Sequence, residues 1–398
     1  STKNNRTKML KKLLIMFVII FHKNNLKEKY WIQLDKKLKI AIIGSRGYPY
    51  VYSGYETLVK ELSERLVKSG HHVRVYCHSS LFNKKPRQVN GVELVYTPSI
   101  KSKIFSQLFN SFFSFIHVCF SKIDVVLVVN SANGPFGLLT KILKKKTCIN
   151  VDGLEWLRPK WKGLGSFYFK WASKMATIFY DQIINDSDEM RKVYLNLFKK
   201  DSKVIAYGAN IRKSESPQLI NKLNLKQREY YLVVGRLIPD NNADLIINGF
   251  IKSNSKKKLV IVGDVSYKDS YASNLKKLSD ERLVFTGYVK DQNILAELYL
   301  NCYAYIHGHE FGGTNPTMIK AMAYGCAILA LDTVFCQEML QKGKFGLFFK
   351  KEIFSIINTI NYCEKENVLM DKLRQESVNG ITEKYDWNFV ASQYLEVF

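Results

Sequence analysis

The chain alternates short apolar runs with longer amphipathic segments from Lys39 to its end. Leu58, Leu62 and Leu66 recur at four-residue spacing, which predicts a helix over Tyr55–Lys68. The apolar runs that predict strands are Ile40–Ile43, Val73–Cys77, Val92–Tyr96, Asp124–Val129, Cys148–Val151, Ile183–Ile184, Val204–Ala206, Tyr230–Val234, Lys258–Val262, Leu283–Phe285, Ala304–Ile306 and Ala327–Leu331. Because these runs alternate with helical patterns, they predict parallel sheets covered on both faces.

A polar stretch, Asn210–Gln227, divides this alternation into two series and favours a linker. The chain has 398 residues, and domains usually hold roughly 100–200 residues. We therefore expect an α/β fold with two doubly wound Rossmann-like domains, residues 39–210 and 211–384, and a terminal helix over residues 385–398. Ligands of such folds bind at the carboxyl ends of the strands, so the loops there are the candidate sites.

The loop around Gly312 and Gly313 follows an apolar strand run and precedes the apolar stretch Met318–Ala323. Thr314 or Asn315 is the expected cap of the following helix, with a proline in its first turn. Glycines let a ligand approach the backbone, and the amides of a helix N-terminus favour a phosphate. This segment therefore predicts an anion site.

A second glycine loop follows the first strand, with glycines at Gly44, Gly47 and Gly54 before the helix that contains Tyr55 and Glu56. The spacing differs from the G-x-G-x-x-G dinucleotide fingerprint. Gly54 could receive an anion or a sugar, and a tight strand–helix turn is the alternative. Two such junctions favour a nucleotide-diphosphate ligand held between two domains.

A third segment with candidate chemistry follows the strand that ends at position 151. It contains Asp152, Glu155, Trp156, Arg158 and Trp161. Asp152 or Glu155 could orient a hydroxyl, and Asp152 is preferred because a carboxylate at a strand end has no evident structural use. The tryptophan rings could stack on a sugar, with core packing as the alternative.

Gly47 through Tyr76, Asp152 through Trp161 and Gly308 through Ala323, together with Gly235-Arg236, resemble the retaining sugar-nucleotide glycosyltransferases of the GT-B fold (family 4 type, group 1). Within that family they are similar to bacterial polysaccharide rhamnosyltransferases. The resemblance covers about residues 39–398. It implies sugar transfer from a nucleotide diphosphate to an acceptor hydroxyl with retained configuration, without a cofactor or a metal.

The resemblance also implies roles for individual residues. The catalytic candidates are Asp152, Glu310 and Arg236. The donor-binding candidates are Gly47, Gly54, Arg236, Asn241, Asn242, Gly263, Gly287, Tyr288, Gly312, Gly313, Thr314, Asn315 and Lys320. The acceptor-binding candidates are Tyr55, Glu56, Glu155, Trp156, Arg158 and Trp161. Arg236 and the amides of the second loop would stabilise the charge on the leaving diphosphate.

The sequence departs from the family at three positions. A family lysine is replaced by Asn241, although it or Asn242 could cap the next helix. The two family glutamates correspond to Gly312 and Lys320, and the nearest acid is Glu310, which a two-residue loop shift could bring to the sugar. The second glutamate normally holds ribose hydroxyls, so Lys320 is compatible with a deoxyribose, dTDP-linked donor. A weakened or inactive enzyme is the competing interpretation.

The net charge is +25, which favours a negative membrane surface or a lipid-diphosphate acceptor over nucleic acid, because no RNA- or DNA-reading motif is present. A lysine-rich solvated surface is the alternative. The seven cysteines are scattered without a C-x-x-C pair, which fits a reducing cytosol and gives no zinc site. His307 and His309 lack a clear third metal ligand.

Residues 1–38 form a basic and apolar extension outside the resemblance. Its apolar run Leu13–Phe21 is flanked by lysines and is shorter than the about 20 residues that span a bilayer. An anchor at the membrane interface is one interpretation, and a helix packed on the protein body is the other. The expected location is the cytoplasm, peripheral to the inner face of the plasma membrane.

These observations predict transfer of L-rhamnose from dTDP-L-rhamnose to a lipid-diphosphate-linked saccharide in the biosynthesis of a bacterial surface polysaccharide such as a capsule. Three alternatives stay open. One is the same fold with a UDP- or GDP-linked donor, and another is a sugar-nucleotide epimerase. The third is a non-catalytic partner of a glycan-assembly complex, suggested by the missing glutamates.

Overall fold

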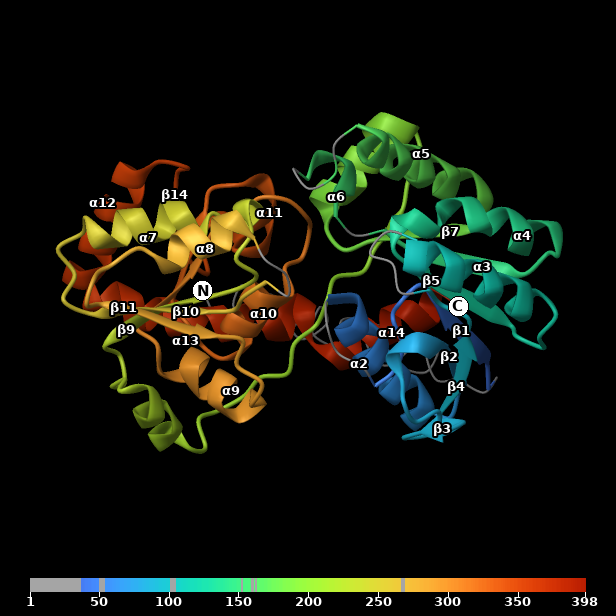
Figure 1. Cartoon of the computed structure of the whole chain (residues 1–398), viewed down its shortest axis with the longest axis horizontal. Coiled ribbons are helices and arrows are strands. Elements are labelled where there is room, and N and C mark those ends of the chain that lie inside the picture. The colour runs from blue at the N-terminus through green and yellow to red at the C-terminus, as the bar shows by residue number, and fades with distance from the viewer. Residues whose placement is uncertain are drawn as a thin grey trace, which may run out of the picture.

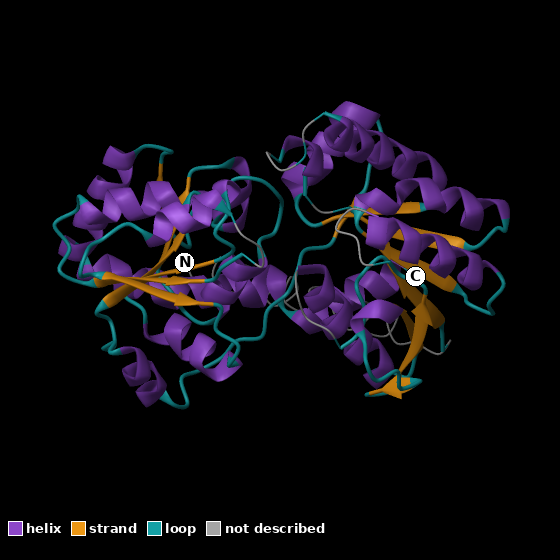
Figure 2. Ribbon diagram, in the orientation of Figure 1, coloured by secondary structure: helices purple, strands orange, loops and turns teal. Residues whose placement is uncertain are grey.

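The computed structural model describes residues 37–49, 54–100, 105–151, 153–158, 161, 163–265 and 269–398. Two sheets, each flanked by helices, form the two halves of the molecule (Figures 1 and 2). This arrangement confirms the predicted α/β class with two Rossmann-like domains. Each apolar run that predicted a strand overlaps one in the structure.

The first sheet is parallel except for its antiparallel edge pair β3–β4. Its strands, in spatial order, are β3 (Gln88–Val89), β4 (Val92–Thr97), β2 (His72–His78), β1 (Lys39–Ile43), β5 (Val125–Val129), β6 (Lys146–Asn150), β7 (Gln182–Asn185) and β8 (Lys203–Val204). Ile40 and Ile42 pack in one core cluster, whereas Ala41 and Ile43 pack in another on the opposite face. Both faces of the sheet are therefore buried, which explains why its strands are apolar throughout.

The second sheet is parallel throughout. Its strands, in spatial order, are β11 (Leu283–Gly287), β10 (Lys258–Val262), β9 (Tyr230–Val234), β12 (Ala304–His307), β13 (Ile328–Leu331) and β14 (Leu347–Phe349). The strand order reverses at β9, as it does at β1 in the first sheet. The carboxyl ends of strands at such switch points are where α/β folds bind ligands, and both glycine loops begin there.

The helices of the first domain are α2 (Gly54–Lys68), α3 (Phe105–Cys119), α4 (Gly137–Ile142), α5 (Leu164–Phe179) and α6 (Asp188–Phe198). Those of the second are α7 (Ala243–Ile251), α8 (Ser270–Lys276), α9 (Gln292–Asn301), α10 (Pro316–Ala323), α11 (Val334–Met339), α12 (Ile353–Lys365) and α13 (Asn367–Gly380). No helix in these described ranges combines the length and apolar character that a bilayer crossing requires.

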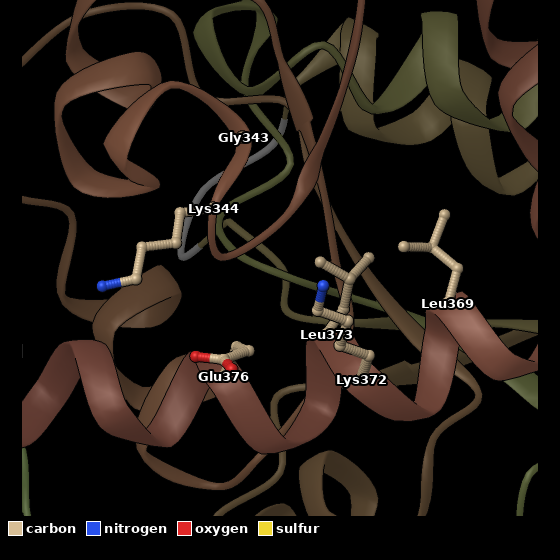
Figure 3. A pocket seen from close by; sticks show the side chains of 6 residues that line it. All are labelled: Gly343, Lys344, Leu369, Lys372, Leu373 and Glu376. Carbon is tan, nitrogen blue, oxygen red and sulfur yellow. The ribbon is translucent and has the colours of Figure 1, made fainter.

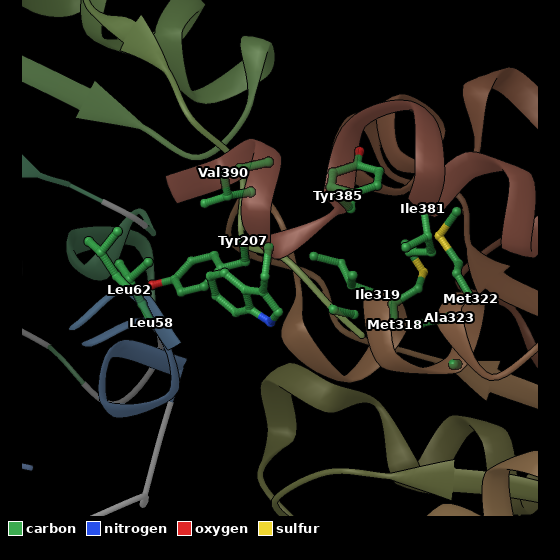
Figure 4. Packing of buried hydrophobic residues seen from close by; sticks show 14 of the residues in the cluster. Leu58, Leu62, Tyr207, Met318, Ile319, Met322, Ala323, Ile381, Tyr385 and Val390 are labelled. Atoms are coloured by element: carbon green, nitrogen blue, oxygen red, sulfur yellow. The ribbon is translucent and has the colours of Figure 1, made fainter. Parts of the chain in front are cut away.

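The terminal helix α14 (Trp387–Val397) returns to the first domain and packs on α2 (Figure 1). There the Asn150 amide donates to the Tyr394 hydroxyl at 2.8 Å. A single apolar cluster also runs from Leu58 and Leu62 on α2, through Tyr207, to Ile319 on α10 (Figure 4). The two domains therefore share a core beside the ends of their central strands.

Candidate functional site

The second glycine loop connects β12 to α10 as the sequence predicted. The Asn315 side chain caps α10 by accepting the Thr317 amide at 3.0 Å, and Pro316 is the first helical residue. Gly312 has φ of +117°, a conformation that residues with a Cβ rarely adopt. No acceptor in the described part of the chain takes the amide of Gly312 or Gly313. These two amides are therefore uncommitted, and Gly313 is buried beside the Asp186 carboxylate.

Positive charge gathers around Gly312 from both domains. A Cβ built on Gly312 would lie 3.8 Å from Arg158 Nη2, 3.9 Å from Gly153 Cα and 3.6 Å from His309 Nε2. Burial, the neighbouring His307 and the charges of Arg158 and Arg236 hold the pKa of His309 well below its usual value. The structure thus brings Arg158 of the acceptor segment and Arg236 of the donor domain to the same loop.

Arg236 follows β9 and its side chain is exposed. Its guanidinium makes no ion pair or hydrogen bond with any described residue. Its backbone carbonyl accepts the Asn241 side-chain amide at 2.7 Å, and Asn241 Oδ1 lies 2.7 Å from His309 Nδ1. Asn241 therefore fixes the Arg236 turn to the second glycine loop.

One expectation about the asparagines is wrong. Neither caps α7 with its side chain. Asn242 occupies the N-cap position, but its side-chain amide donates to the Gly308 carbonyl at 2.8 Å instead. Asn242 has a left-handed backbone conformation (φ +51°), unlike the extended conformation usual for a capping residue. Both asparagines instead tie strand ends together.

Glu310 is held by contacts within the second domain. Its Oε2 lies 2.7 Å from Lys351 Nζ and accepts the Asn242 amide at 3.4 Å. The carboxylate is therefore already paired, and the loop shift considered for it would have to break these contacts.

Asp186 is a site residue that the sequence analysis did not single out. It directly follows β7 of the first domain and is 2% exposed. Its Oδ2 accepts the Thr314 amide at 2.8 Å, and its carbonyl accepts the Thr314 hydroxyl. A Cβ on Gly313 would lie 1.8 Å from Asp186 Oδ1. The Thr314 amide, expected to bind diphosphate, is thus occupied by a carboxylate from the other domain.

Glu338 of α11 makes the reciprocal contact. Its two carboxylate oxygens accept the backbone amides of Asp188 and Glu189, each at 2.9 Å, at the start of α6 in the first domain. Lys384 Nζ lies 3.1 Å from the same carboxylate. Each domain therefore supplies one carboxylate to backbone amides of the other. The position of Asp186 after an apolar strand was the signal that could have identified it.

Lys320 lies in the last turn of α10 and is half-buried. Burial lowers its pKa, the charge of Glu61 on α2 opposes this effect, and Arg212 adds to it. Lys320 therefore lies within the electrostatic influence of the first domain's α2.

The acceptor segment is organised around one carboxylate. Glu155 Oε1 lies 3.0 Å from Arg158 Nε, and Glu155 Oε2 accepts the Trp161 indole N–H at 2.8 Å. Trp156 is buried and packs edge-on against Tyr194, which is the core role considered for it. Glu155 thus positions Arg158 toward Gly312. Asp152, the predicted catalytic carboxylate, lies outside the described residues.

Two described glycines of the first loop, Gly47 and Gly54, are closely packed. A Cβ on Gly47 would lie 2.9 Å from the Cys77 side chain, and one on Gly54 would lie 3.2 Å from Pro316. Glu56 is buried and accepts the Arg46 amide at 3.0 Å. Tyr55 packs against the shared core. These contacts match the tight-turn alternative, and Gly54 meets the second loop instead of open space.

The turns after β10 and β11 border the Arg236 turn. The Gly263 amide donates to the Gly287 carbonyl at 2.9 Å, and a Cβ on Gly263 would lie 1.9 Å from the Gly235 carbonyl oxygen. Tyr288 is largely exposed. Gly263 therefore allows two strand ends to touch, and Tyr288 is accessible beside them.

The two histidines of the loop make local contacts. His307 Nδ1 lies 3.2 Å from the Tyr305 hydroxyl, and burial lowers the His307 pKa to about 3. Within the described ranges, no three His, Cys, Asp or Glu side chains are grouped to hold a metal ion. The seven cysteines are buried free thiols.

A surface depression of the second domain lies elsewhere (Figure 3). None of the predicted site residues lines it. Its walls are Gly343, Lys344, Leu369, Lys372, Leu373 and Glu376.

Comparison with known proteins defines the class. Residues 215–379 match the family model "Glycosyl transferases group 1", and residues 37–210 match a domain of unknown function, DUF1972. The fold is that of GT-B glycosyltransferases. Sucrose-phosphate synthase from Thermosynechococcus elongatus has a TM-score of 0.75 at 15% identity, over 91% of this chain and 98% of that one. Anabaena HepE, solved with UDP and glucose, has a TM-score of 0.72 at 15% identity, over 90% and 98%.

Two curated relatives are similar to this chain in sequence. An uncharacterized glycosyltransferase of Methanocaldococcus jannaschii is 25% identical over 91% of this chain and 98% of its own length. The N,N'-diacetylbacillosaminyl-diphospho-undecaprenol alpha-1,3-N-acetylgalactosaminyltransferase of Campylobacter jejuni is 24% identical over 64% and 74%. Together with the fold, these matches support glycosyltransferase activity for this chain.

Proposed function

We propose that this chain is a retaining glycosyltransferase that moves a sugar, most specifically L-rhamnose from dTDP-L-rhamnose, to a lipid-diphosphate-linked saccharide. Residues 39–210 would bind the acceptor and residues 211–384 the donor. The observation that carries the proposal is the meeting of Arg158, Arg236 and two uncommitted amides at Gly312 and Gly313. This set of donors suits a diphosphate.

In the proposed reaction, the bond between the sugar's anomeric carbon and the diphosphate oxygen breaks, and the acceptor oxygen bonds to that carbon from the same face. The acceptor's proton passes to the departing diphosphate. Arg236 and the Gly312 and Gly313 amides would stabilise the negative charge that develops there. Asn241 holds the backbone of the Arg236 turn against the second glycine loop, so the turn that carries the guanidinium is already in place.

The dTDP assignment depends on Lys320. A carboxylate at that position would serve ribose hydroxyls, and deoxyribose lacks the 2′-hydroxyl. We therefore expect Lys320→Glu to transfer from dTDP-rhamnose no faster than the parent chain. A large gain in rate with Lys320→Glu would remove the argument that Lys320 is a working donor contact.

The acceptor assignment is supported by the Campylobacter relative, whose name specifies a diphospho-undecaprenol-linked saccharide. The +25 net charge suits the anionic surface where such a lipid resides. We place the protein peripherally at that surface. If residues 1–38 anchor it, a chain starting at Lys36 should partition less into vesicles than the full chain.

A thermal-shift panel of nucleotide sugars tests the donor. A ligand that binds the native state raises the melting temperature by mass action. We expect the largest shift with dTDP-rhamnose and loss of that shift in Arg236→Gln, while Arg87→Gln, an exposed arginine on the first domain, retains it. No shift with any nucleotide sugar would contradict the donor site.

A UDP-linked donor is the second candidate. The Campylobacter relative is named as an N-acetylgalactosaminyltransferase, and the similar Anabaena structure holds UDP. A larger shift with UDP sugars than with dTDP sugars would favour this candidate and remove the rhamnose assignment.

A further inference from the structure

The outer face of the first domain exposes an unusual number of large apolar side chains. They occur as stripes at three- and four-residue spacing along three helices. Those on α3 and just after it are Phe109, Phe112, Ile116 and Phe120, those on α4 and just after it are Leu138, Ile142 and Leu143, and those on α5 are Leu164, Phe167, Trp171 and Ile178.

These stripes form one surface, here called the α3–α4–α5 face. Helix α4 contacts both α3 and α5, and the three helices lie on the same side of the first sheet (Figure 1). The rings of Phe112 and Phe136, 6.5 Å apart, join α3 to the segment before α4. The Lys141 ammonium donates to the Ile178 carbonyl at 2.7 Å and joins α4 to α5.

The charge carried by the three helices has one sign, although the exposed Asp124 and Asp181 follow α3 and α5. None of the three helices contains aspartate or glutamate. Exposed lysines lie on or beside them at Lys122, Lys144, Lys170 and Lys174. Aromatic and aliphatic side chains ringed by lysines are the composition that binds an anionic lipid interface. A protein partner would more commonly offer acidic side chains or a groove that matches this face. Neither feature is needed to explain a face of this composition.

The α3–α4–α5 face also leads to the candidate site. The acceptor segment that holds Glu155 and Arg158 runs directly into α5. Leu157 and Leu164, both exposed, flank that connection. A membrane on this face would therefore hold a lipid headgroup close to the segment that reaches Gly312.

We propose that the α3–α4–α5 face docks the folded protein on an anionic membrane, independently of residues 1–38. The proposal rests on the proposed function, because a lipid-linked acceptor requires access to a bilayer. Phe120, Leu164 and Phe167 would enter the interface, and the lysines would contact lipid phosphates.

The test uses the full chain and vesicles of phosphatidylcholine with or without phosphatidylglycerol. Phe120, Leu164 and Phe167 are 83%, 88% and 70% exposed, so changing all three to Gln should leave the fold intact. We expect the triple variant to lose about tenfold in partition to anionic vesicles, since each side chain loses apolar burial. The matched control is Phe354→Gln with Val368→Gln, which are 70% and 85% exposed on the second domain, and it should bind like the parent.

Equal binding by the triple variant and the parent, or equal binding to neutral and anionic vesicles, would overturn the proposal. So would light scattering that shows self-association of the parent lost in the triple variant, because the face would then join two copies. The donor thermal shift separates this result from the proposed function. It should be unchanged in the triple variant, and its absence in the parent would contradict the glycosyltransferase instead.

Discussion

The two glycine loops each connect a strand to a helix but differ in what surrounds them. In the described part of the loop after β1, Gly47 packs against Cys77 of the same domain and Glu56 accepts the Arg46 amide. The loop after β12 keeps the amides of Gly312 and Gly313 uncommitted within the described residues and has Arg158 beside it. The same residue type thus serves packing in one loop and ligand access in the other.

The difference teaches that a glycine marks a place where another group comes close to the backbone. It does not show whether that group is a side chain or a ligand. In the first loop the close neighbour is a side chain or, at Gly54, Pro316 of the other domain. In the second loop the neighbours are Asp186 and cations. Only the charged side chains that the fold places beside a glycine loop distinguish a ligand site from a structural turn.

The largest expected effect is on the transfer rate, and it comes from removing the arginine charge beside each loop. Arg236→Gln should reduce kcat for transfer about 100- to 1,000-fold, because a donor to the developing charge is lost. Arg46→Gln, beside the first loop, should cost far less. Steady-state kinetics with both substrates measures the difference, and equal losses in the two variants would contradict the assignment of the second loop to the diphosphate.

Glycine-to-alanine changes compare the space around a glycine in each of the two loops. Gly313→Ala would place a Cβ 1.8 Å from Asp186 Oδ1, whereas Gly54→Ala would place one 3.2 Å from a proline ring carbon. We expect Gly313→Ala to lower the unfolding free energy by about 2–3 kcal/mol, since overpacking a rigid contact is destabilising. Gly54→Ala should stay within about 1 kcal/mol of the parent. Urea unfolding of both variants measures this, and equal stabilities would show that the domains separate freely at Asp186.

Both loops have a buried neutral histidine nearby, which predicts a shared acid sensitivity. Burial lowers the pKa of His78, near Arg46, to about 4 and that of His307 to about 3. The unfolded chain, with a histidine pKa of about 6.5, takes up these protons first, so stability is complete above that pH and falls as the pH drops through 5. Each histidine should contribute about 2 kcal/mol of loss between pH 7 and pH 5.

Urea unfolding at the two pH values checks this sensitivity. His78→Asn and His307→Asn should each flatten the dependence relative to the parent. His72→Asn, at the exposed start of β2, serves as the control. An unchanged pH dependence in both buried-site variants would mean that other groups cause the acid sensitivity.

The smallest expected effect concerns the carboxylate that crosses to the second loop. Asp186→Asn keeps an acceptor for the Thr314 amide but removes the charge, so the interdomain contact should weaken by about 1 kcal/mol. Removing a negative charge beside the diphosphate should lower the donor KM at the same time. Glu338→Gln, which makes the reciprocal contact farther from Gly312, should weaken stability without lowering KM. A KM that rises in Asp186→Asn would mean that the carboxylate positions the loop for binding.

The sequence predicted the fold well because its strands are buried on both faces and therefore read as continuous apolar runs. It also predicted the Asn315–Pro316 helix start, since capping is local chemistry. The cross-domain contacts of Asp186 and Glu338 could not be predicted, because they join residues more than a hundred positions apart. The two-stranded edge around β3 was also missed, since two residues give no periodic pattern.

The side-chain roles were harder to predict than their location. Asn242 lies at the expected position, yet it bonds the Gly308 carbonyl instead of capping α7. Glu310 lies in the expected loop, yet Lys351 pairs with it. Which nearby partner a polar side chain bonds depends on differences in distance of a few tenths of an ångström. The spacing of residues in a sequence does not encode these differences.

A crystal structure of the full chain with bound dTDP tests the central claim most directly. We predict that the diphosphate oxygens lie within hydrogen-bonding distance, about 3 Å, of Arg236 and of the Gly312 and Gly313 amides. A diphosphate bound instead against Gly47 and Gly54, or away from both loops, would contradict the account.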